Sequence, residues 1–172
     1  MKDIFSVIHE RKSVRNYNGN PISKTDLDEI IRAGMAAPTA VNMQPWSFVI
    51  VTERKLLDEL AAGLPHAKML TKAGAAIVGC TEPDKAYEKS TDMAIIDASL
   101  AGENIMLAIE ALGLGGVWTA AYPYADRMTH VKTILNIPGE VIPLNVIAIG
   151  VPAGKDKPKD KYKKDKIHWE RW

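Results

Sequence analysis

Three cations and a hydroxyl occupy five consecutive positions near the start of the chain, in the run Arg11-Lys-Ser-Val-Arg15. In an extended segment, residues 11, 13 and 15 point the same way. Two guanidinium groups with a hydroxyl between them offer charge-assisted and neutral donors that suit a phosphate group. The alternative is a solvated basic turn, and the motif alone does not decide between the two.

Two amide side chains lie in a loop between prolines, in the run Pro38-Thr-Ala-Val-Asn-Met-Gln-Pro-Trp46. Asn42 and Gln44 each carry donors and an acceptor, which suit the edge of a heterocycle with alternating donors and acceptors. On the motif alone, a structural loop whose amides bond neighbouring backbone groups is the stronger interpretation.

Glycines dominate a third run, Gly113-Leu-Gly-Gly-Val-Trp118. Glycines after a helix usually form a C-terminal cap and a turn. They also let the backbone approach a flat ligand, because they lack a Cβ atom. The run differs from GxGxxG and follows a predicted helix instead of preceding one, so it does not indicate a Rossmann dinucleotide site.

Other catalytic chemistry lacks its residues. The four histidines show no metal-ligand spacing such as HxxxH, and the sequence has neither GxSxG nor Walker A, so we predict no metal site. Cys80 lies in an apolar run and is expected to be an inert core thiol. Asp92 and Asp97 do not share a helix face well, so they make a weak carboxylate pair, and we assign no catalytic acid or base. A phosphate-type site without a nucleophile or metal favours a bound cofactor.

The elements that must position these motifs alternate helices with short apolar strands, as in α/β or α+β proteins. Five helices are predicted: one at 3–10, one that begins at a Ser23 capping box and ends before Pro38, one after a Thr52 cap, one from Thr91 to Gly113, and one at 126–135. Four strands are predicted, at 46–51, 75–80, 117–120 and 144–149. The helix that ends at Gly113 carries apolar residues on more than one stripe, so we expect it to be covered nearly all round.

The composition is that of one globular domain, with 172 residues, 47% of them hydrophobic, and a net charge of +1. Near-neutral charge argues against a nucleic-acid binder. A single cysteine excludes a disulfide scaffold, and neither a signal peptide nor a membrane span is expected. These features predict a cytoplasmic protein.

Residues 154–172 differ from the rest, with seven lysines and one arginine against four acids. The segment cannot form its own core. It is either a solvated tail or an arm whose tryptophans, Trp169 and Trp172, dock on a partner subunit. We therefore divide the chain into a domain at 1–153 and a C-terminal arm at 154–172.

Taken in order, these runs resemble the nitroreductase family of flavin mononucleotide (FMN) enzymes, in its small-subunit branch. The resemblance rests on the three runs above, on Ile149-Gly-Val-Pro152, and on the tail residues Lys157-Pro-Lys-Asp-Lys161 with His168-Trp169. It covers essentially the whole chain.

The resemblance implies an α+β fold, a mixed sheet packed by helices, in an intertwined homodimer with a long central interface helix and FMN at the subunit interface. It implies that Arg11, Ser13 and Arg15 hold the flavin phosphate and ribityl chain, with backbone contacts from Lys12, and that Lys159 and Lys161 close the phosphate site. Lys161 stands where the family often has arginine. Pro38, Thr39, Asn42 and Gln44 would reach the flavin ring, partly from the opposite subunit. Trp118, Thr119, Ala120 and Ala121 match backbone donors near the reactive N5, and Lys68 matches a lysine near the pyrimidine edge.

The function implied is an NAD(P)H-dependent flavin oxidoreductase. Hydride would pass through flavin N5 in ping-pong turnover to nitroaromatic, quinone or similar electrophilic acceptors. Three alternatives stay open: a flavin-binding sensor or carrier without turnover, a related flavin enzyme that carries out dehalogenation or flavin destruction, and a nucleic-acid binder that uses the lysine tail. The near-neutral charge disfavours the last of these.

Overall fold

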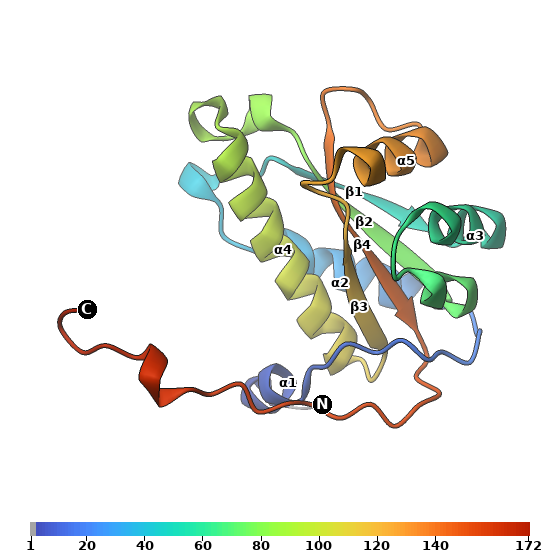
Figure 1. The fold of residues 1–172 in the computed structure, drawn as a ribbon, viewed down its shortest axis with the longest axis horizontal. Coiled ribbons are helices and arrows are strands. Elements are labelled where there is room, and N and C mark those ends of the chain that lie inside the picture. Colours follow the sequence, from blue (N-terminus) through green and yellow to red (C-terminus); the bar gives the residue numbers. More distant parts are fainter. Residues whose placement is uncertain (1–2) are drawn as a thin grey trace.

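A four-stranded sheet lies between two layers of helices in the computed structural model, which describes residues 3–172 (Figure 1). The strands are β1 (Trp46–Val51), β2 (Ala75–Thr81), β3 (Gly115–Ala120) and β4 (Ile142–Gly150). They lie in the order β1-β2-β4-β3, and each neighbouring pair is antiparallel. The predicted strands are confirmed, and the bounds of β1 match the prediction.

Every neighbouring pair of the four strands is antiparallel, and a parallel pairing occurs at the edge of the sheet. β2 and β3 run in the same direction, but β4 is inserted between them and is antiparallel to both. Direct parallel pairing is supplied by an isolated bridge between Ser13 and Gly116, outside the named strands. The N-terminal segment therefore lies against the outer edge of β3.

Each face of the sheet carries its own hydrophobic cluster. The helices are α1 (Ile4–Glu10), α2 (Lys24–Met35), α3 (Arg54–Gly63), α4 (Thr91–Ala111) and α5 (Ala125–Leu135), with short 3₁₀ turns at Ala40–Asn42, Lys68–Lys72, Pro83–Lys85, Tyr87–Lys89 and Lys164–Lys166. Alternate residues of β2 and β4 face α2 and α4 on one side, as Ile77 and Ile147 do. Their neighbours Val78 and Val146 face α3 and α5 on the other side. Because both faces are covered, all residues of β2 are buried.

Two predicted helix caps are wrong by one residue, and two others are confirmed. The side chain that caps α4 is Ser90, which accepts from Met93 N, instead of Thr91. α3 begins after Glu53 without a side-chain cap, instead of after a Thr52 cap. Ser23 caps α2 as predicted. Gly113 lies past the end of α4 with φ +73°, and its N–H donates to Glu110 O, so glycine provides the expected left-handed turn.

α4 is not covered all round within one chain. The sheet and α2 pack against part of its circumference, whereas Ile96 and Leu100 are 51% and 42% exposed. The tail beyond residue 153 passes α1 and extends away from the body (Figure 1). Its two tryptophans are exposed in this single chain.

Candidate functional site

The segment that carries Arg11, Ser13 and Arg15 is fixed to the sheet by Val14 and Tyr17. Val14 N–H donates to Gly116 O at 3.0 Å. The Tyr17 hydroxyl donates to Val14 O at 2.6 Å and lies 3.3 Å from Ala148 O. Burial raises the pKa of this hydroxyl, so it stays a protonated donor. Residues 13 and 15, on either side of the buried Val14, are exposed.

The segment and the tail together line a cationic hollow of about 630 Å³. Seven cationic side chains surround it, with one carboxylate, a hydroxyl and a proline: Arg11, Lys12, Ser13, Arg15, Lys155, Asp156, Lys157, Pro158, Lys159 and Lys161. The structure therefore brings the predicted N-terminal phosphate residues together with the predicted tail lysines, which lie about 145 residues further along the chain. Sequence reasoning did not assign Lys155 or Lys157 to the site.

Two of these cations already form ion pairs with α4. Lys12 Nζ lies 3.3 Å from a carboxylate oxygen of the buried Glu110, which ties Lys12 to the body. Arg11 Nε lies 3.5 Å from the exposed Glu103. Lys12 thus acts in positioning the segment, whereas Ser13 and Arg15 remain directed to the hollow.

A second, smaller hollow of about 160 Å³ adjoins the first at Arg15, which lines both. It runs along the outer edge of β3 and is also lined by Pro65, His66, Met69, Val117, Trp118, Thr119, Ala120 and Arg127. A residue's N–H and C=O point to the same edge of a strand, and successive residues alternate. Because Gly116 O points outward to Val14, the backbone groups of Trp118 and Ala120 also point outward. They offer N–H donors along this hollow.

Arg127 is a residue of this hollow that sequence reasoning missed. Its guanidinium donates to Ala120 O at 3.3 Å and stacks 3.7 Å from the centre of the Tyr124 ring. No motif marks Arg127 in the sequence, because its place depends on how α5 packs after β3.

Thr119, Ala121 and Lys68 are placed differently from Trp118 and Ala120. Thr119 and Ala121 are buried, and Ala121 N–H donates inward to Leu144 O. Lys68 is exposed on the 3₁₀ turn Lys68–Lys72 and does not line the hollow. Two of its neighbours in the chain, His66 and Met69, do line it.

The loop with Pro38, Thr39, Asn42 and Gln44 lies away from both hollows. Its Ala40 N–H donates to Asp97 on α4, whereas Lys12 pairs with Glu110 near the other end of that helix. These α4 residues are thirteen positions apart, or about 20 Å along a helix. One chain therefore holds the cationic residues and the amide loop towards opposite ends of α4 (Figure 1).

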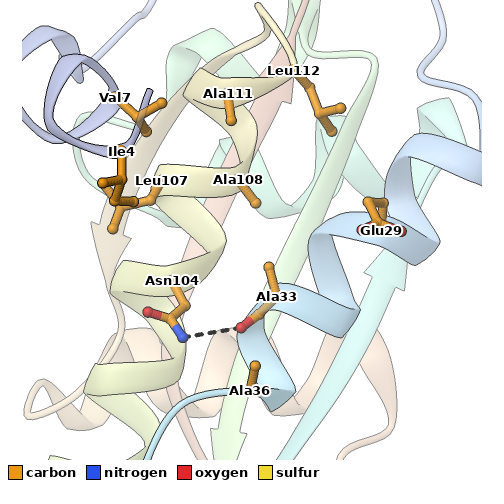
Figure 2. A pocket seen from close by; sticks show the side chains of 10 residues that line it. All are labelled: Ile4, Val7, Glu29, Ala33, Ala36, Asn104, Leu107, Ala108, Ala111 and Leu112. Carbon is orange, nitrogen blue, oxygen red and sulfur yellow. Dashed lines mark hydrogen bonds between the residues drawn. The ribbon is translucent and has the colours of Figure 1, made fainter. Parts of the chain in front are cut away.

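An apolar hollow of about 500 Å³ between α1, α2 and α4 contains none of the predicted cofactor residues. Figure 2 shows aliphatic side chains from all three helices around it, with Asn104 donating to Ala33 O at 3.1 Å. Glu29 and Asn104 are the polar residues of this otherwise aliphatic lining.

Metal and thiol chemistry find no support in the part of the chain that is described. Within residues 3–172, His, Cys, Asp and Glu side chains form no group of three or more that could hold a metal ion. Burial raises the pKa of the Cys80 thiol from 9.0 to about 12.

None of the helices formed by residues 3–172 combines the length and apolar character needed to cross a bilayer.

Comparisons with known proteins show which family and which structures this chain is similar to. The model of the Nitroreductase family matches residues 8–67 and 61–154. A protein of Archaeoglobus fulgidus, named as a presumed NADH dehydrogenase/NAD(P)H nitroreductase, is 38% identical over 175 residues and the full length of both chains. An FMN reductase (NADPH) of Bacillus subtilis is 25% identical and is matched over 99% of this chain and 74% of its own. The crystal structure of a presumed NADH dehydrogenase/NAD(P)H nitroreductase from Parabacteroides distasonis is 45% identical, with a TM-score of 0.93 over the full length of both chains.

Proposed function

The chain belongs to the nitroreductase family, and from that premise we propose that it is an FMN-dependent NAD(P)H oxidoreductase whose acceptors are nitroaromatics, quinones or similar electrophiles. The observation that carries the proposal is that Arg15 lines both hollows. A phosphate held among the cations would leave an attached ring system within reach of the outward N–H groups of β3.

The donor set of the larger hollow fits a flavin phosphate. Arg11, Ser13 and Arg15 supply guanidinium and hydroxyl donors, and Lys159 and Lys161 add charge from the tail. Lysine at 161 provides a point charge instead of a bidentate fork. The one carboxylate, Asp156, disfavours a second anion close to it and helps to direct the phosphate towards the arginines.

The free edge of β3 fits the ring of the same cofactor. FMN, when bound, supplies the ring that accepts hydride from NAD(P)H and passes it to the acceptor in ping-pong turnover. Outward N–H groups of Trp118 and Ala120 would orient that ring and stabilise negative charge on it, with Arg15 and Arg127 as nearby cations. Lys68 is assigned to the pyrimidine edge on the family resemblance.

A homodimer would complete the site. The amide loop of one chain lies about 20 Å along α4 from its own cationic hollow, so Pro38, Thr39, Asn42 and Gln44 would reach the ring of the partner. The exposed apolar residues of α1 and α4 supply the kind of surface that an obligate interface buries, and the arm at 154–172 carries exposed tryptophans that would dock on the partner.

The test is an absorbance spectrum of the purified protein, with heat release and chromatography of the chromophore. We expect stoichiometric FMN that NADH or NADPH reduces in a stopped-flow trace and that an added quinone or nitroaromatic reoxidises. Bound FMN that neither nucleotide reduces would instead indicate a flavin carrier or sensor. A colourless protein that also refuses added FMN would refute the proposal.

A further inference from the structure

A buried carboxylate on α4 holds the amide loop. Asp97 is 2% exposed, and its Oδ1 accepts a hydrogen bond from Ala40 N at 3.1 Å. Its Oδ2 is also buried and has no hydrogen-bond partner within the described residues. Burying a charge is unfavourable unless it is well paired. A contribution to the stability of the fold therefore does not explain why an acid is buried here. The hydrogen bond from Ala40 of the loop is the contact that Asp97 makes.

The loop needs such an anchor because of its backbone conformation. Val41, Asn42 and Gln44 have φ of 50°, 59° and 53°, in the left-handed region that non-glycine residues rarely adopt. A strained conformation persists only where surrounding contacts over-determine it.

Most of the hydrogen bonds near this strained segment connect the loop to itself. Gln44 N–H donates to Thr39 Oγ1 at 3.1 Å, and Gln44 Nε2 donates to Asn42 Oδ1 at 3.0 Å. The far end is held to the body where Pro45 O accepts from Glu82 N at 2.8 Å. At the near end, Asp97 supplies the corresponding link through Ala40.

We propose that Asp97 is a positioning residue for cofactor binding. By accepting from Ala40 N–H it fixes the loop in the conformation that presents the amides of Asn42 and Gln44 to the flavin ring. A carboxylate makes a stronger acceptor for a backbone N–H than a neutral group does. This inference rests on the proposed function, because it takes the loop as part of the flavin site.

Two nearly isosteric substitutions separate positioning from stability. Asp97→Leu removes the acceptor together with a buried carboxylate that has no cationic partner among residues 3–172, and burying such an unpaired charge is unfavourable for the fold. Asp97→Asn keeps an acceptor oxygen for Ala40. We expect Asp97→Leu to keep or raise the midpoint of thermal unfolding, yet to weaken FMN binding about tenfold, the effect of one charge-assisted hydrogen bond. Asp97→Asn should stay within about threefold of the parent protein.

The matched control and a second readout make the result specific. Asp92→Ala removes an exposed carboxylate from the first turn of the same helix and should leave FMN affinity unchanged. Hydrogen–deuterium exchange of the FMN-free protein should show faster exchange at the Ala40 amide in Asp97→Leu but not in Asp97→Asn.

Unchanged FMN affinity in Asp97→Leu, or equal losses in the Leu and Asn variants, would overturn the inference. If the parent protein itself binds no FMN, the proposed function fails. In that case exchange at Ala40 still decides whether Asp97 holds the loop, and an unchanged rate in Asp97→Leu would refute it.

Discussion

Removing the two arginines of the cationic hollow should separate folding from cofactor binding. In the double variant Arg11→Ala with Arg15→Ala, the backbone contacts that fix the segment remain, because they are made by Val14 and Tyr17. The ion pair of Arg11 with the exposed Glu103 contributes little to stability. We therefore expect a folded protein with a normal circular dichroism spectrum.

The loss of affinity can be estimated from the contacts removed. A hydrogen bond to a charged group contributes about 1.5–3 kcal/mol, so two contribute about 3–6 kcal/mol. At about 1.4 kcal/mol for each factor of ten, FMN affinity should fall by a factor of about 10² to 10⁴. The lysines that remain around the hollow still attract the phosphate, so we expect the loss of FMN affinity to lie nearer to about 10² than to about 10⁴.

The assay is titration of the FMN-free protein with FMN, followed by quenching of flavin fluorescence. Lys24→Ala with Lys55→Ala is the matched control, since it removes two exposed cations that line neither hollow. Affinity that falls equally in both double variants would mean that the effect is one of overall charge. Full FMN occupancy in the arginine variant would refute the phosphate assignment itself.

Three further substitutions or probes test the packing around the site. Tyr17→Phe leaves the buried Val14 carbonyl without its donor, and should lower the free energy of unfolding by about 1–3 kcal/mol in urea denaturation; an unchanged midpoint would contradict the anchoring role. Gly102→Ala would place a Cβ against the Trp118 ring, so we expect a shifted tryptophan emission and a loss of about 1–3 kcal/mol in the free energy of unfolding. Gly139→Ala, which has open space around it, should change neither. Because the pKa of Cys80 is raised to about 12, its thiol should resist DTNB at pH 8 until the protein is unfolded. Above pH 9 the unfolded chain loses that proton first, so the contribution of Cys80 to stability should decline between pH 9 and 12; rapid labelling of the native protein would contradict the burial.

The secondary structure was predictable wherever local chemistry decides it. The aromatic and β-branched run at β1, the Ser23 cap and Gly113 at the end of α4 all follow from short-range preferences. The cap of α4 was displaced by one residue because Ser90 and Thr91 carry equivalent hydroxyls, whereas α3 begins after Glu53 without any side-chain cap. Strand order was not predictable in this way, since the insertion of β4 between β2 and β3 depends on long-range packing.

The candidate site was predictable in its motifs but not in their partners. Arg11, Ser13 and Arg15 were predicted from residue type and spacing, whereas Lys159 and Lys161 came from the family resemblance, and the structure brings both sets around one hollow. Asp97 was interpreted only as half of a weak carboxylate pair with Asp92. Asp97 stands between Ile96 and Ala98 in the sequence, and an acid within an apolar stretch of a helix was a usable signal, because buried charges are rare. Its partner, Ala40, lies 57 positions earlier in the chain, and only the tertiary structure reveals the contact. The cytoplasmic location and the two-part division of the chain stay predictions.

The outer edge of β3 has a consequence for solubility. An exposed edge strand is a template on which another chain can add a strand and begin to aggregate. Here the hydrogen-bonding row is interrupted at both ends, because Gly116 O accepts from Val14 and Ala120 O accepts from Arg127. Within residues 3–172, the N–H and C=O of Trp118 and the N–H of Ala120 stay without a partner on this edge, and they form too short a stretch to seed an intermolecular sheet. The contacts of Val14 and Arg127 thus protect the chain against self-association along the edge to which we assign the flavin ring.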